Sequence, residues 1–445
     1  MKPVSASVML MALVVFPGYA ANMPEAPSYL GEIRRGADGR LIAVPPAAPE
    51  EAALPAAPPV QGKTSQVAHP TPKADVRSSA PAAAPRTIRV GPQQQVRNLS
   101  VAATLAQDGD TIEVEPGDYV ADIAIWKQDN LTIRGVGAAR PRLIAAGASA
   151  EGKAIWVVRG GRIAVENLEF RGARVPDRNG AGIRFERGYL TVRNCKFEDN
   201  ENGILSAGGS NMYLDIENSE FGHNGAGDGR SHNIYIGEIT RLRVTGSYFH
   251  HARKGHLLKS RAAENHVFYN RLSDEIDGHA SYELEFPNGG IAYVIGNIIE
   301  QGSQTENSNI ISYGAEGLLN RPNSLYLLNN TIVDNRPSNG NVLAVVHRIP
   351  KLLIMNNLLV TRRKFEIAQD AQISNNPNVD WQPFALAARY DFRLKSNADV
   401  AGKYVRPPAS NDVSLIPQRE YVHPAGSRPL SGGTRHPGAM QSLSP

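Results

Sequence analysis

The sequence of 445 residues has one cysteine, few aromatic residues and no long apolar run after its first twenty residues. Cys195 therefore has no partner for an internal disulfide, and its place two residues before Phe197 in an expected strand predicts a buried, unreactive thiol. A transmembrane helix needs about 18 or more apolar residues in succession, so we expect no membrane insertion of the mature chain. No basic stripe is interleaved with aromatic residues, which argues against a nucleic-acid partner.

Residues 1–20 are typical of a secretory signal peptide. Lys2 precedes an apolar run from Val8 to Phe16, and small residues at 18 and 20 predict cleavage after Ala20. We therefore expect a periplasmic or secreted protein, with an uncleaved anchor or a disordered start as the alternative. Residues 21–86 include long stretches of proline and alanine that cannot bury a core, and they are predicted to form a disordered linker.

A short strand pattern that ends near an asparagine or glycine recurs from residue 163 onward. The seven intervals between Asn167 and Asn356 cover 189 residues and average 27, which is the period of a solenoid. At each marker we expect the chain to turn through positive φ, and stacked asparagines can form a hydrogen-bonded ladder. The markers are Asn167, Asn194, Asn218, Gly246, Asn270, Asn297, Asn329 and Asn356, and the phenylalanines expected to stack inside are Phe170, Phe197, Phe221 and Phe249.

Coils of this length predict an all-β fold for residues 87–404, namely a right-handed parallel β-helix. Apolar spacing around Leu99, Ala102 and Leu105 predicts a short N-terminal capping helix. Residues 405–445 are expected to form a tail that packs on the last coils. The repeat, the segment "AATLAQDGDTIEVEPGDY" and the segment "NPNVDWQPFALAARYDFRLKSNADVAGK" together resemble the pectate-lyase-like β-helix superfamily. This resemblance implies the fold but no single reaction, because its members include lyases, hydrolases, epimerases, esterases and adhesins.

Aligned strands before the markers place charged residues on one exposed sheet. If Ile234, Leu258 and Leu284 point inward, alternation predicts an outward row of Tyr235, Lys259 and Glu285. A second outward column then contains Asn233, Leu257 and Glu283, and Arg261 follows Lys259 at about 6.6 Å along the same strand. His232, His256 and Tyr282 share a third column, as a satisfied polar stack or as side chains that face a groove. The loops ahead of these strands bring Arg230, Asp277 and His279.

This set of residues suits binding to an acidic polysaccharide, which is the partner we expect. We expect the chain itself to be a monomer. β-Elimination from a uronic acid requires a base, a cation that neutralises the carboxylate, and an acid for the departing oxygen. Tyr235 is a candidate acid or base, and the predicted substrate-binding residues are Arg230, His232, Asn233, His256 and His279. The carboxylates of Glu283 and Glu285 have a spacing that can hold Ca²⁺, with Asn233 or Asp277 completing the oxygen ligands.

The combination is similar to the β-helix polysaccharide lyases that include the alginate lyase and chondroitinase B group. That resemblance implies Lys259 as the base, Arg261 as the acid or the carboxylate neutraliser, and Glu283 with Glu285 as metal ligands. In that group the acidic pair precedes the lysine and the arginine lies on a later coil. Here Lys259 and Arg261 share a strand and precede the glutamates.

Several alternatives stay open at this point. Lys259 could form a surface ion pair with Glu285, and Arg261 could pair with Glu283 or Asp277. A glycoside hydrolase would draw two carboxylates from Asp277, Glu283 and Glu285. A uronate C5-epimerase and a non-catalytic glycan-binding module or adhesin are the other classes. A zinc site in "HHARKGH" is disfavoured, because neighbouring histidines of a strand point in opposite directions.

Overall fold

A computed structural model describes residues 32–35, 41–44 and 85–444, apart from 276, 338–339, 363–364, 366, 368, 387–390 and 411–412. The chain divides into two units, Met1–Ser78 and Ser79–Pro445. In the first unit, β1 (Glu32–Arg35) and β2 (Leu41–Val44) pair in antiparallel register, so the segment expected to be a disordered linker contains a strand pair. The predicted signal peptide lies outside the described residues.

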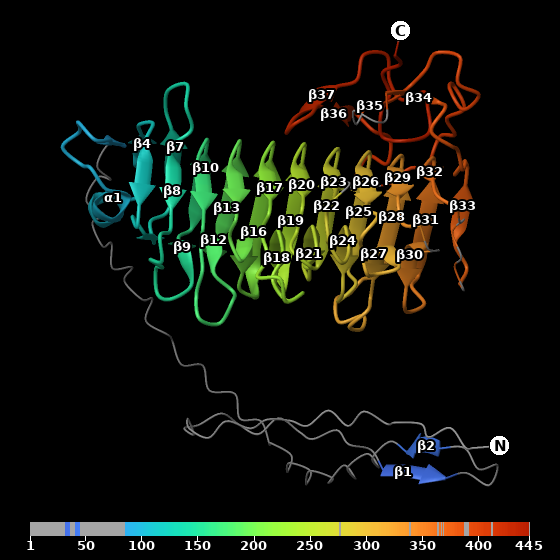
Figure 1. Cartoon of the computed structure of the whole chain (residues 1–445), viewed down its shortest axis with the longest axis horizontal. Helices are drawn as coiled ribbons and strands as arrows, with labels where there is room; N and C mark the ends of the chain where they lie inside the picture. Colours follow the sequence, from blue (N-terminus) through green and yellow to red (C-terminus); the bar gives the residue numbers. More distant parts are fainter. Residues whose placement is uncertain are drawn as a thin grey trace, which may run out of the picture. The chain divides into compact units, whose positions relative to one another are not determined.

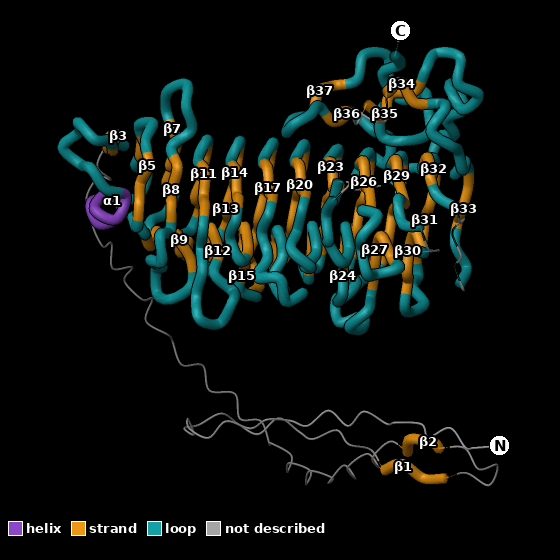
Figure 2. The backbone as a smooth tube through the Cα atoms, in the orientation of Figure 1, coloured by secondary structure: helices purple, strands orange, loops and turns teal. Residues whose placement is uncertain are grey.

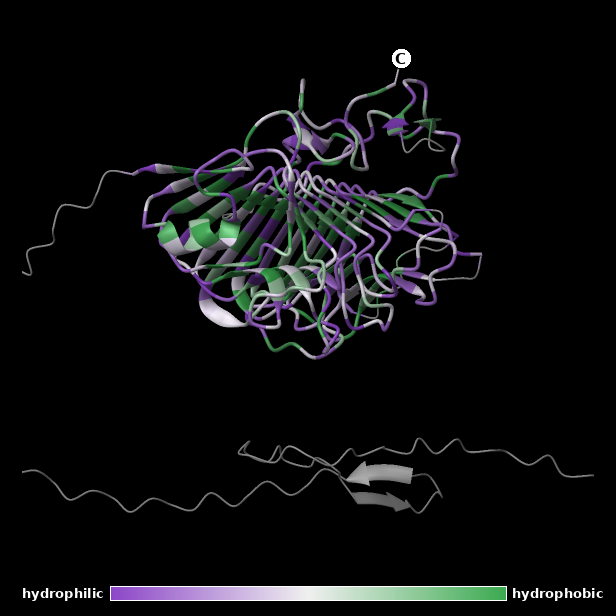
Figure 3. Cartoon of the chain, turned by 60° about the vertical axis from the view of Figure 1, so that its left-hand side comes forward, coloured by the Kyte–Doolittle hydropathy of each residue, from purple (hydrophilic) through white to green (hydrophobic). Residues whose placement is uncertain are grey.

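Three parallel sheets wind around one apolar core in the described part of the second unit (Figure 1). Successive strands pass from one sheet to the next, and each strand pairs in register with its counterpart on the neighbouring coil. The predicted parallel β-helix is therefore confirmed. Figure 3 shows hydropathy changing from residue to residue along the strands, as expected where one side of a sheet is buried.

We name each sheet after two of its strands. The β3–β33 sheet contains β3 (Thr87–Val90), β4 (Thr111–Val114), β7 (Leu131–Gly135), β10 (Arg162–Glu166), β13 (Tyr189–Arg193), β16 (Gly209–Glu217), β19 (Ile239–Thr245), β22 (Glu264–Phe268), β25 (Ile291–Ile295), β28 (Ser324–Leu328), β31 (Lys351–Met355) and β33 (Gln372–Ser374). The β5–β32 sheet contains β5 (Asp118–Val120), β8 (Arg142–Ile144), β11 (Glu169–Arg171), β14 (Lys196–Glu198), β17 (Glu220–Gly222), β20 (Tyr248–His250), β23 (Arg271–Ser273), β26 (Ile298–Gln301), β29 (Thr331–Asp334) and β32 (Leu358–Val360). The β6–β30 sheet contains β6 (Ala124–Trp126), β9 (Ala154–Val158), β12 (Ala181–Phe185), β15 (Asn202–Ser206), β18 (Ile234–Ile236), β21 (Leu258–Ser260), β24 (Leu284–Phe286), β27 (Asn309–Tyr313) and β30 (Asn341–Val345).

The first coil is covered by helix α1 (Leu99–Leu105), at the site of the predicted capping helix. Leu99 and Ala102 are buried in the core of the β-helix. The carboxylate of Asp122 accepts the backbone N–H groups of Leu99 at 2.6 Å and Ser100 at 2.9 Å. These hydrogen bonds satisfy donors that a helix N-terminus leaves free. Among the described residues, no helix combines the length and apolar character that crossing a membrane requires.

Aromatic rings and asparagines stack along the helix axis. Phe170, Phe197, Phe221 and Phe249 are stacked with centroid separations of 4.9, 4.7 and 4.8 Å, as predicted. Cys195 is buried, and burial raises the pKa of its thiol to about 12, which agrees with an unreactive side chain.

The asparagine ladder is present, one residue after the positions where the chain turns through positive φ. Tyr269 and Gly296 have positive φ, whereas Asn270 and Asn297 follow them and are fully buried. Their side chains hydrogen-bond from coil to coil, so the predicted alignment of these two markers was wrong by one residue. The ladder consists of Ser219, Ser247, Asn270, Asn297, Asn330, Asn357 and Asn376.

The C-terminal segment returns along the later coils (Figure 2). It contains two antiparallel pairs, β34 (Phe384–Leu386) with β35 (Asp391–Leu394), and β36 (Arg419–Tyr421) with β37 (Ser427–Pro429). Gln418 donates its backbone N–H to the Tyr269 hydroxyl, and Asn329 donates to the carbonyl of His436. The tail therefore contacts coils well before the last one.

Candidate functional site

The predicted row of polar side chains lies on the outer face of the β6–β30 sheet. Strands β18, β21 and β24 pair so that Tyr235 lies beside Lys259, and Lys259 beside Glu285. The alternation of strand residues explains this row, since the flanking residues are fully buried and all but Ser260 form part of the apolar core. Those flanking residues are Ile234, Ile236, Leu258, Ser260, Leu284 and Phe286.

Lys259 on β21 and Arg261 directly after it both contact the carboxylate of Glu316, which lies on a loop distant in sequence. Lys259 Nζ lies 3.1 Å from Glu285 Oε2 and 3.2 Å from Glu316 Oε1. Arg261 donates from Nη2 to the same Glu316 oxygen at 2.9 Å and from Nε to the Tyr235 hydroxyl at 3.0 Å. The side chains of Lys259 and Arg261 are only 12% and 17% exposed, so these contacts are partly shielded from water. We call Tyr235, His256, Lys259, Arg261, Glu285 and Glu316 the Lys259 cluster.

Sequence reasoning missed Glu316 and the two residues that support Arg261. Glu316 belongs to the connection between β27 and β28, which is longer than the corresponding connections of the neighbouring coils. Arg261 Nη1 donates to Asn288 Oδ1 at 2.6 Å, and Asn288 in turn donates to Glu238 at 2.9 Å. The sequence could have indicated Glu316 in one way. It is the acidic residue of an unusually long connection between two expected strands, next to a sheet that carries two cations.

The charges of the Lys259 cluster compensate one another. Burial disfavours ionisation of Glu285, but contacts with His256 and Lys259 outweigh it and hold the pKa of Glu285 below its usual range. The hydrogen bond from Arg261, with Lys259 nearby, lowers the pKa of Glu316. Burial would lower the pKa of Arg261, yet its bonds to Glu316 and Tyr235 raise it. Two carboxylates therefore face an ammonium and a guanidinium group.

The column of His232, His256 and Tyr282 is a stack of rings in which the two histidines are buried and Tyr282 is partly exposed. The His232 and His256 rings are 4.5 Å apart, and the backbone N–H of His256 donates to His232 Nδ1 at 2.9 Å. Burial lowers the pKa of both histidines, so they are neutral near pH 7. The stack contacts the charged row at two points: His256 Nδ1 lies 3.0 Å from Glu285 Oε2, and the His232 ring packs edge-on against the Tyr235 ring at 5.2 Å.

The predicted second outward column is wrong, since Asn233, Leu257 and Glu283 are fully buried. Asn233 accepts a hydrogen bond from Asn224 Nδ2 at 2.9 Å and donates to the carbonyl of His250, so it does not face a substrate. These residues precede the first strand position, where the chain is still turning and strict alternation does not hold.

Glu283 is fully buried at the end of the connection between β23 and β24, directly before β24. Neither of its carboxylate oxygens has a hydrogen-bond partner among the described residues. Burial, with repulsion from nearby Asp274, raises the pKa of Glu283 well above its usual range, and burial raises the pKa of Asp274 to about 8. Both side chains are therefore protonated over much of the neutral range.

The residues predicted to bind Ca²⁺ do not form one site. Glu283 is enclosed, Glu285 contacts Lys259, and Asp277 is exposed and lies 3.0 Å from His251 Nε2. A calcium ion needs several oxygen ligands around one point, and this set does not supply them. Arg230 and His279 lie on exposed loops outside the Lys259 cluster. Their role in substrate binding stays a prediction.

A parallel β-helix with a charged row on one outer sheet defines this molecule as a solenoid that presents polar side chains on a regular surface. The chain belongs to the right handed beta helix region family, whose model matches residues 123–359. This confirms the predicted right-handed fold. No curated protein matches the sequence.

Two solved structures match the chain, and one of them is similar in fold. Pectate lyase Pel9A superposes with a TM-score of 0.55 at 13% identity, over 80% of this chain and 96% of that protein. This supports the predicted pectate-lyase-like β-helix. The pectin methylesterase from Aspergillus niger gives a TM-score of 0.28 at 11% identity, over 76% of this chain and 94% of that one. The second score is too low to add to the comparison.

Proposed function

We propose that the protein is a polysaccharide lyase that cleaves a uronate-containing polysaccharide by β-elimination at the Lys259 cluster. The observation that carries this proposal is the position of Glu316, one of whose oxygens lies within hydrogen-bond distance of both Lys259 and Arg261. The two cations thus already hold a carboxylate. A uronate carboxylate of the substrate would take the same place, since it offers the same charge and geometry.

The loop position of Glu316 makes such an exchange feasible. Its side chain is 45% exposed, whereas Lys259 and Arg261 are anchored on or next to β21. An acidic polymer can therefore displace a solvated loop carboxylate without unfolding a strand. Arg261 would then neutralise the substrate carboxylate, which acidifies the neighbouring C–H group.

The remaining steps follow from the two groups beside that position. Lys259 first releases its ammonium proton to water, and its neutral amine then takes the proton next to the carboxylate. The electron pair left behind forms the C=C bond as the C–O bond to the leaving sugar breaks. The Tyr235 hydroxyl gives its proton to the departing oxygen. Arg261 donates a hydrogen bond to Tyr235 and stabilises the phenolate that forms. The products are an unsaturated sugar end and a free hydroxyl.

Hydrolysis is supported less well by the same geometry. It requires two carboxylates that flank a glycosidic bond, one of them protonated. Of the three predicted acids, Glu283 is enclosed, Asp277 lies beside His251, and Glu285 contacts Lys259 and His256. The fold neighbour pectate lyase Pel9A agrees with a lyase. We also propose that this chain acts as a monomer in the periplasm or outside the cell.

The test is incubation with a panel of uronate polymers while ultraviolet absorbance of unsaturated sugar ends is recorded. We expect absorbance to rise with the wild type and Lys259→Ala to lower the rate by about 100-fold or more. Lys196→Ala is the matched control, because Lys196 also lies between two glutamates on neighbouring coils, at 3.0 Å from Glu198 and 3.3 Å from Glu220. Equal loss in both variants, or new reducing ends without absorbance, would contradict the proposal.

A further inference from the structure

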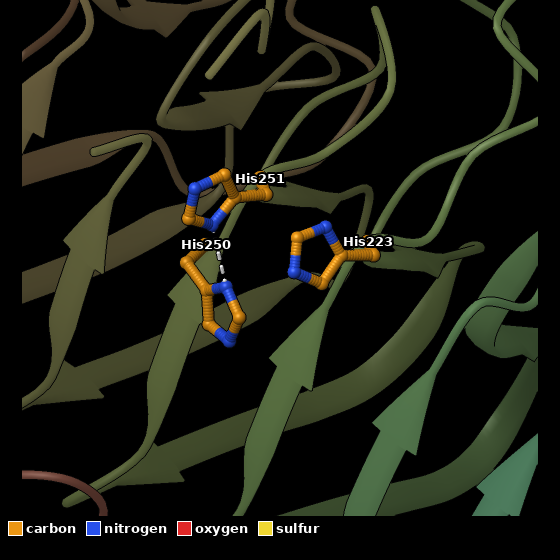
Figure 4. A group of neighbouring side chains, drawn as sticks. All are labelled: His223, His250 and His251. Carbon is orange, nitrogen blue, oxygen red and sulfur yellow. Dashed lines mark hydrogen bonds between the residues drawn. The ribbon is translucent and has the colours of Figure 1, made fainter. Parts of the chain in front are cut away.

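Three histidines of two neighbouring coils meet beside the β5–β32 sheet, away from the Lys259 cluster. His223 follows β17, His250 ends β20, and His251 is the next residue. The sequence pattern predicted opposite directions for His250 and His251. Strand β20 ends at His250, however, and His251 has a φ of 46°, in the left-handed region. This turn brings its side chain beside His250 (Figure 4).

The ring nitrogens of the three side chains converge. Nδ1 of His250 lies 2.7 Å from Nδ1 of His251, and Figure 4 shows a nitrogen of His223 facing this pair. One nitrogen from each residue lies within 4.8 Å of the others. The His250 ring stands at 88° to that of His223 and at 90° to that of His251, whereas the His223 and His251 rings are stacked 4.7 Å apart at 22°. The His250 nitrogen therefore approaches from a different direction than the nitrogens of the other two rings.

The outward nitrogens of two of these rings lie near carboxylates. His251 Nε2 is 3.0 Å from Asp277 Oδ1, and His250 Nε2 is 3.4 Å from Glu220 Oε1. A carboxylate that accepts the N–H of an imidazole fixes the tautomer in which the other nitrogen is free to bind a metal. With Nε2 donating to its carboxylate, each ring can present an unprotonated Nδ1 to a metal ion.

The separation of 2.7 Å between the two Nδ1 atoms is a hydrogen-bond distance. Two nitrogens bound to one Zn²⁺ ion in a tetrahedral site lie roughly 3.3 Å apart, so the two rings would move apart by about half an ångström when the ion binds. Both Nε2–H groups would keep their carboxylate partners, Glu220 and Asp277, in that arrangement.

Gly222 makes room for this arrangement. It pairs with His250 in the register of β17 and β20, and a Cβ atom at Gly222 would lie 2.2 Å from Cε1 and 2.4 Å from Nε2 of His250. A larger residue at 222 would push the imidazole away. The Tyr248 ring stacks on His250 at 4.4 Å and holds it from the other side.

We propose that His223, His250 and His251 bind a divalent transition-metal ion of the class of Zn²⁺, with each imidazole supplying one nitrogen. Three imidazoles with Zn–N distances of about 2.0–2.1 Å suit Zn²⁺, and a fourth position remains for water because His223 and His251 are partly exposed. The ion would join two successive coils. Asp277, which the sequence suggested as a Ca²⁺ ligand, would instead hydrogen-bond to the metal ligand His251. The site does not depend on the proposed lyase function.

The test is titration of the chain, purified without a histidine tag and stripped with a chelator, with Zn²⁺ in a calorimeter. We expect one ion per chain and a rise in melting temperature on binding. Co²⁺ in place of Zn²⁺ should give the visible absorption of a nitrogen-ligated ion.

His223→Asn and His251→Asn are the informative variants, because asparagine tolerates the left-handed backbone at these two positions. Each should weaken Zn²⁺ binding by about 100-fold or more, and Asp277→Asn by about 10-fold. The exposed residue His347 provides the control, and His347→Ala should bind like the wild type. Unchanged affinity in both asparagine variants, or wild-type binding no tighter than that of His223→Asn, would overturn the proposal.

Discussion

Arg261 donates a hydrogen bond of 3.0 Å from Nε to the hydroxyl of Tyr235, which lies on the preceding coil. The guanidinium carbon also lies 5.6 Å from the centre of the Tyr235 ring. Arg261 thus contacts the one hydroxyl of the row while its other nitrogens hold Glu316 and Asn288. The same side chain can therefore neutralise a carboxylate and stabilise an ionised tyrosine, two tasks that elimination requires.

Removal of that hydroxyl tests whether Tyr235 transfers a proton. Tyr235→Phe keeps the ring beside Lys259 but has no proton to give to the leaving oxygen. We expect kcat for elimination to fall by about 100-fold or more, with KM changed little because Lys259 and Arg261 still bind the carboxylate. Initial rates of absorbance over a range of polymer concentrations separate the two constants.

Tyr213→Phe is the control for this change, since Tyr213 lies on β16 in another sheet. A Tyr235→Phe enzyme with normal kcat and raised KM would show that the hydroxyl only contacts substrate. Lys259 alone would then have to supply the proton transfers.

Glu316 is expected to compete with the substrate for Lys259 and Arg261. Glu316→Gln removes the loop's negative charge and leaves both cations without that partner. We predict that KM for an acidic polymer falls by about 2- to 5-fold at low salt, because an exposed ion pair is worth at most about 1 kcal/mol. The difference should shrink as salt is added.

Glu186→Gln is a matched comparison, because Glu186 also bridges a lysine and an arginine, Lys153 at 2.8 Å and Arg159 at 2.6 Å. It should leave KM unchanged. A rise in KM with Glu316→Gln would instead mean that the loop carboxylate helps to hold the substrate.

The enclosed acids predict a fall in stability with rising pH. Glu283 has a folded-state pKa well above its usual range, so the folded protein binds more protons than the unfolded chain above about pH 4.5. The contribution of Glu283 to the free energy of unfolding then decreases as pH rises, and Asp274 adds to this decrease up to its pKa of about 8.

Glu283→Gln removes the Glu283 contribution, since glutamine is neutral at every pH. The variant and the wild type should unfold alike near pH 4, and the variant should be more stable at pH 8, as followed by circular dichroism in urea. Glu217→Gln, a change of a half-exposed side chain, should follow the wild type at both pH values. A variant with no advantage at pH 8 would refute the prediction.

Period and alternation made much of the molecule predictable. Because strand residues alternate between the two faces and coils repeat at nearly constant length, the sequence indicated that Tyr235, Lys259 and Glu285 would lie side by side, as they do. The same rules predicted the β-helix and its phenylalanine stack, and a separate helical spacing of apolar residues predicted its capping helix.

Alternation failed where the chain leaves the strands. Asn233 and Glu283 lie just before β18 and β24, in turns whose side chains follow local φ and ψ angles rather than a period of two. Glu316 joins Lys259 across 57 residues of sequence, through a loop conformation that no periodicity describes. Later coils carry two adjacent asparagines, the first with positive φ and the second in the buried ladder, as in Asn329 and Asn330. Asn270 and Asn297 belong to the second column but were aligned with the first.

The internal ladder should be the most sensitive part of the fold to a single substitution. Asn297 accepts the backbone N–H of Asn270 at 2.9 Å and donates to the carbonyl of Val267 at 2.8 Å and to Asn330 Oδ1 at 2.9 Å. Asn297→Ala leaves these buried groups unpaired, at about 1–3 kcal/mol for each group. We expect the free energy of unfolding to fall by about 2–5 kcal/mol.

Asn341→Ala, which removes an exposed hydrogen bond of 3.0 Å to Asn309, should lower the free energy of unfolding by less than about 1 kcal/mol. Equal destabilisation of the two variants in urea would show that the buried ladder is no more important than surface pairing between coils.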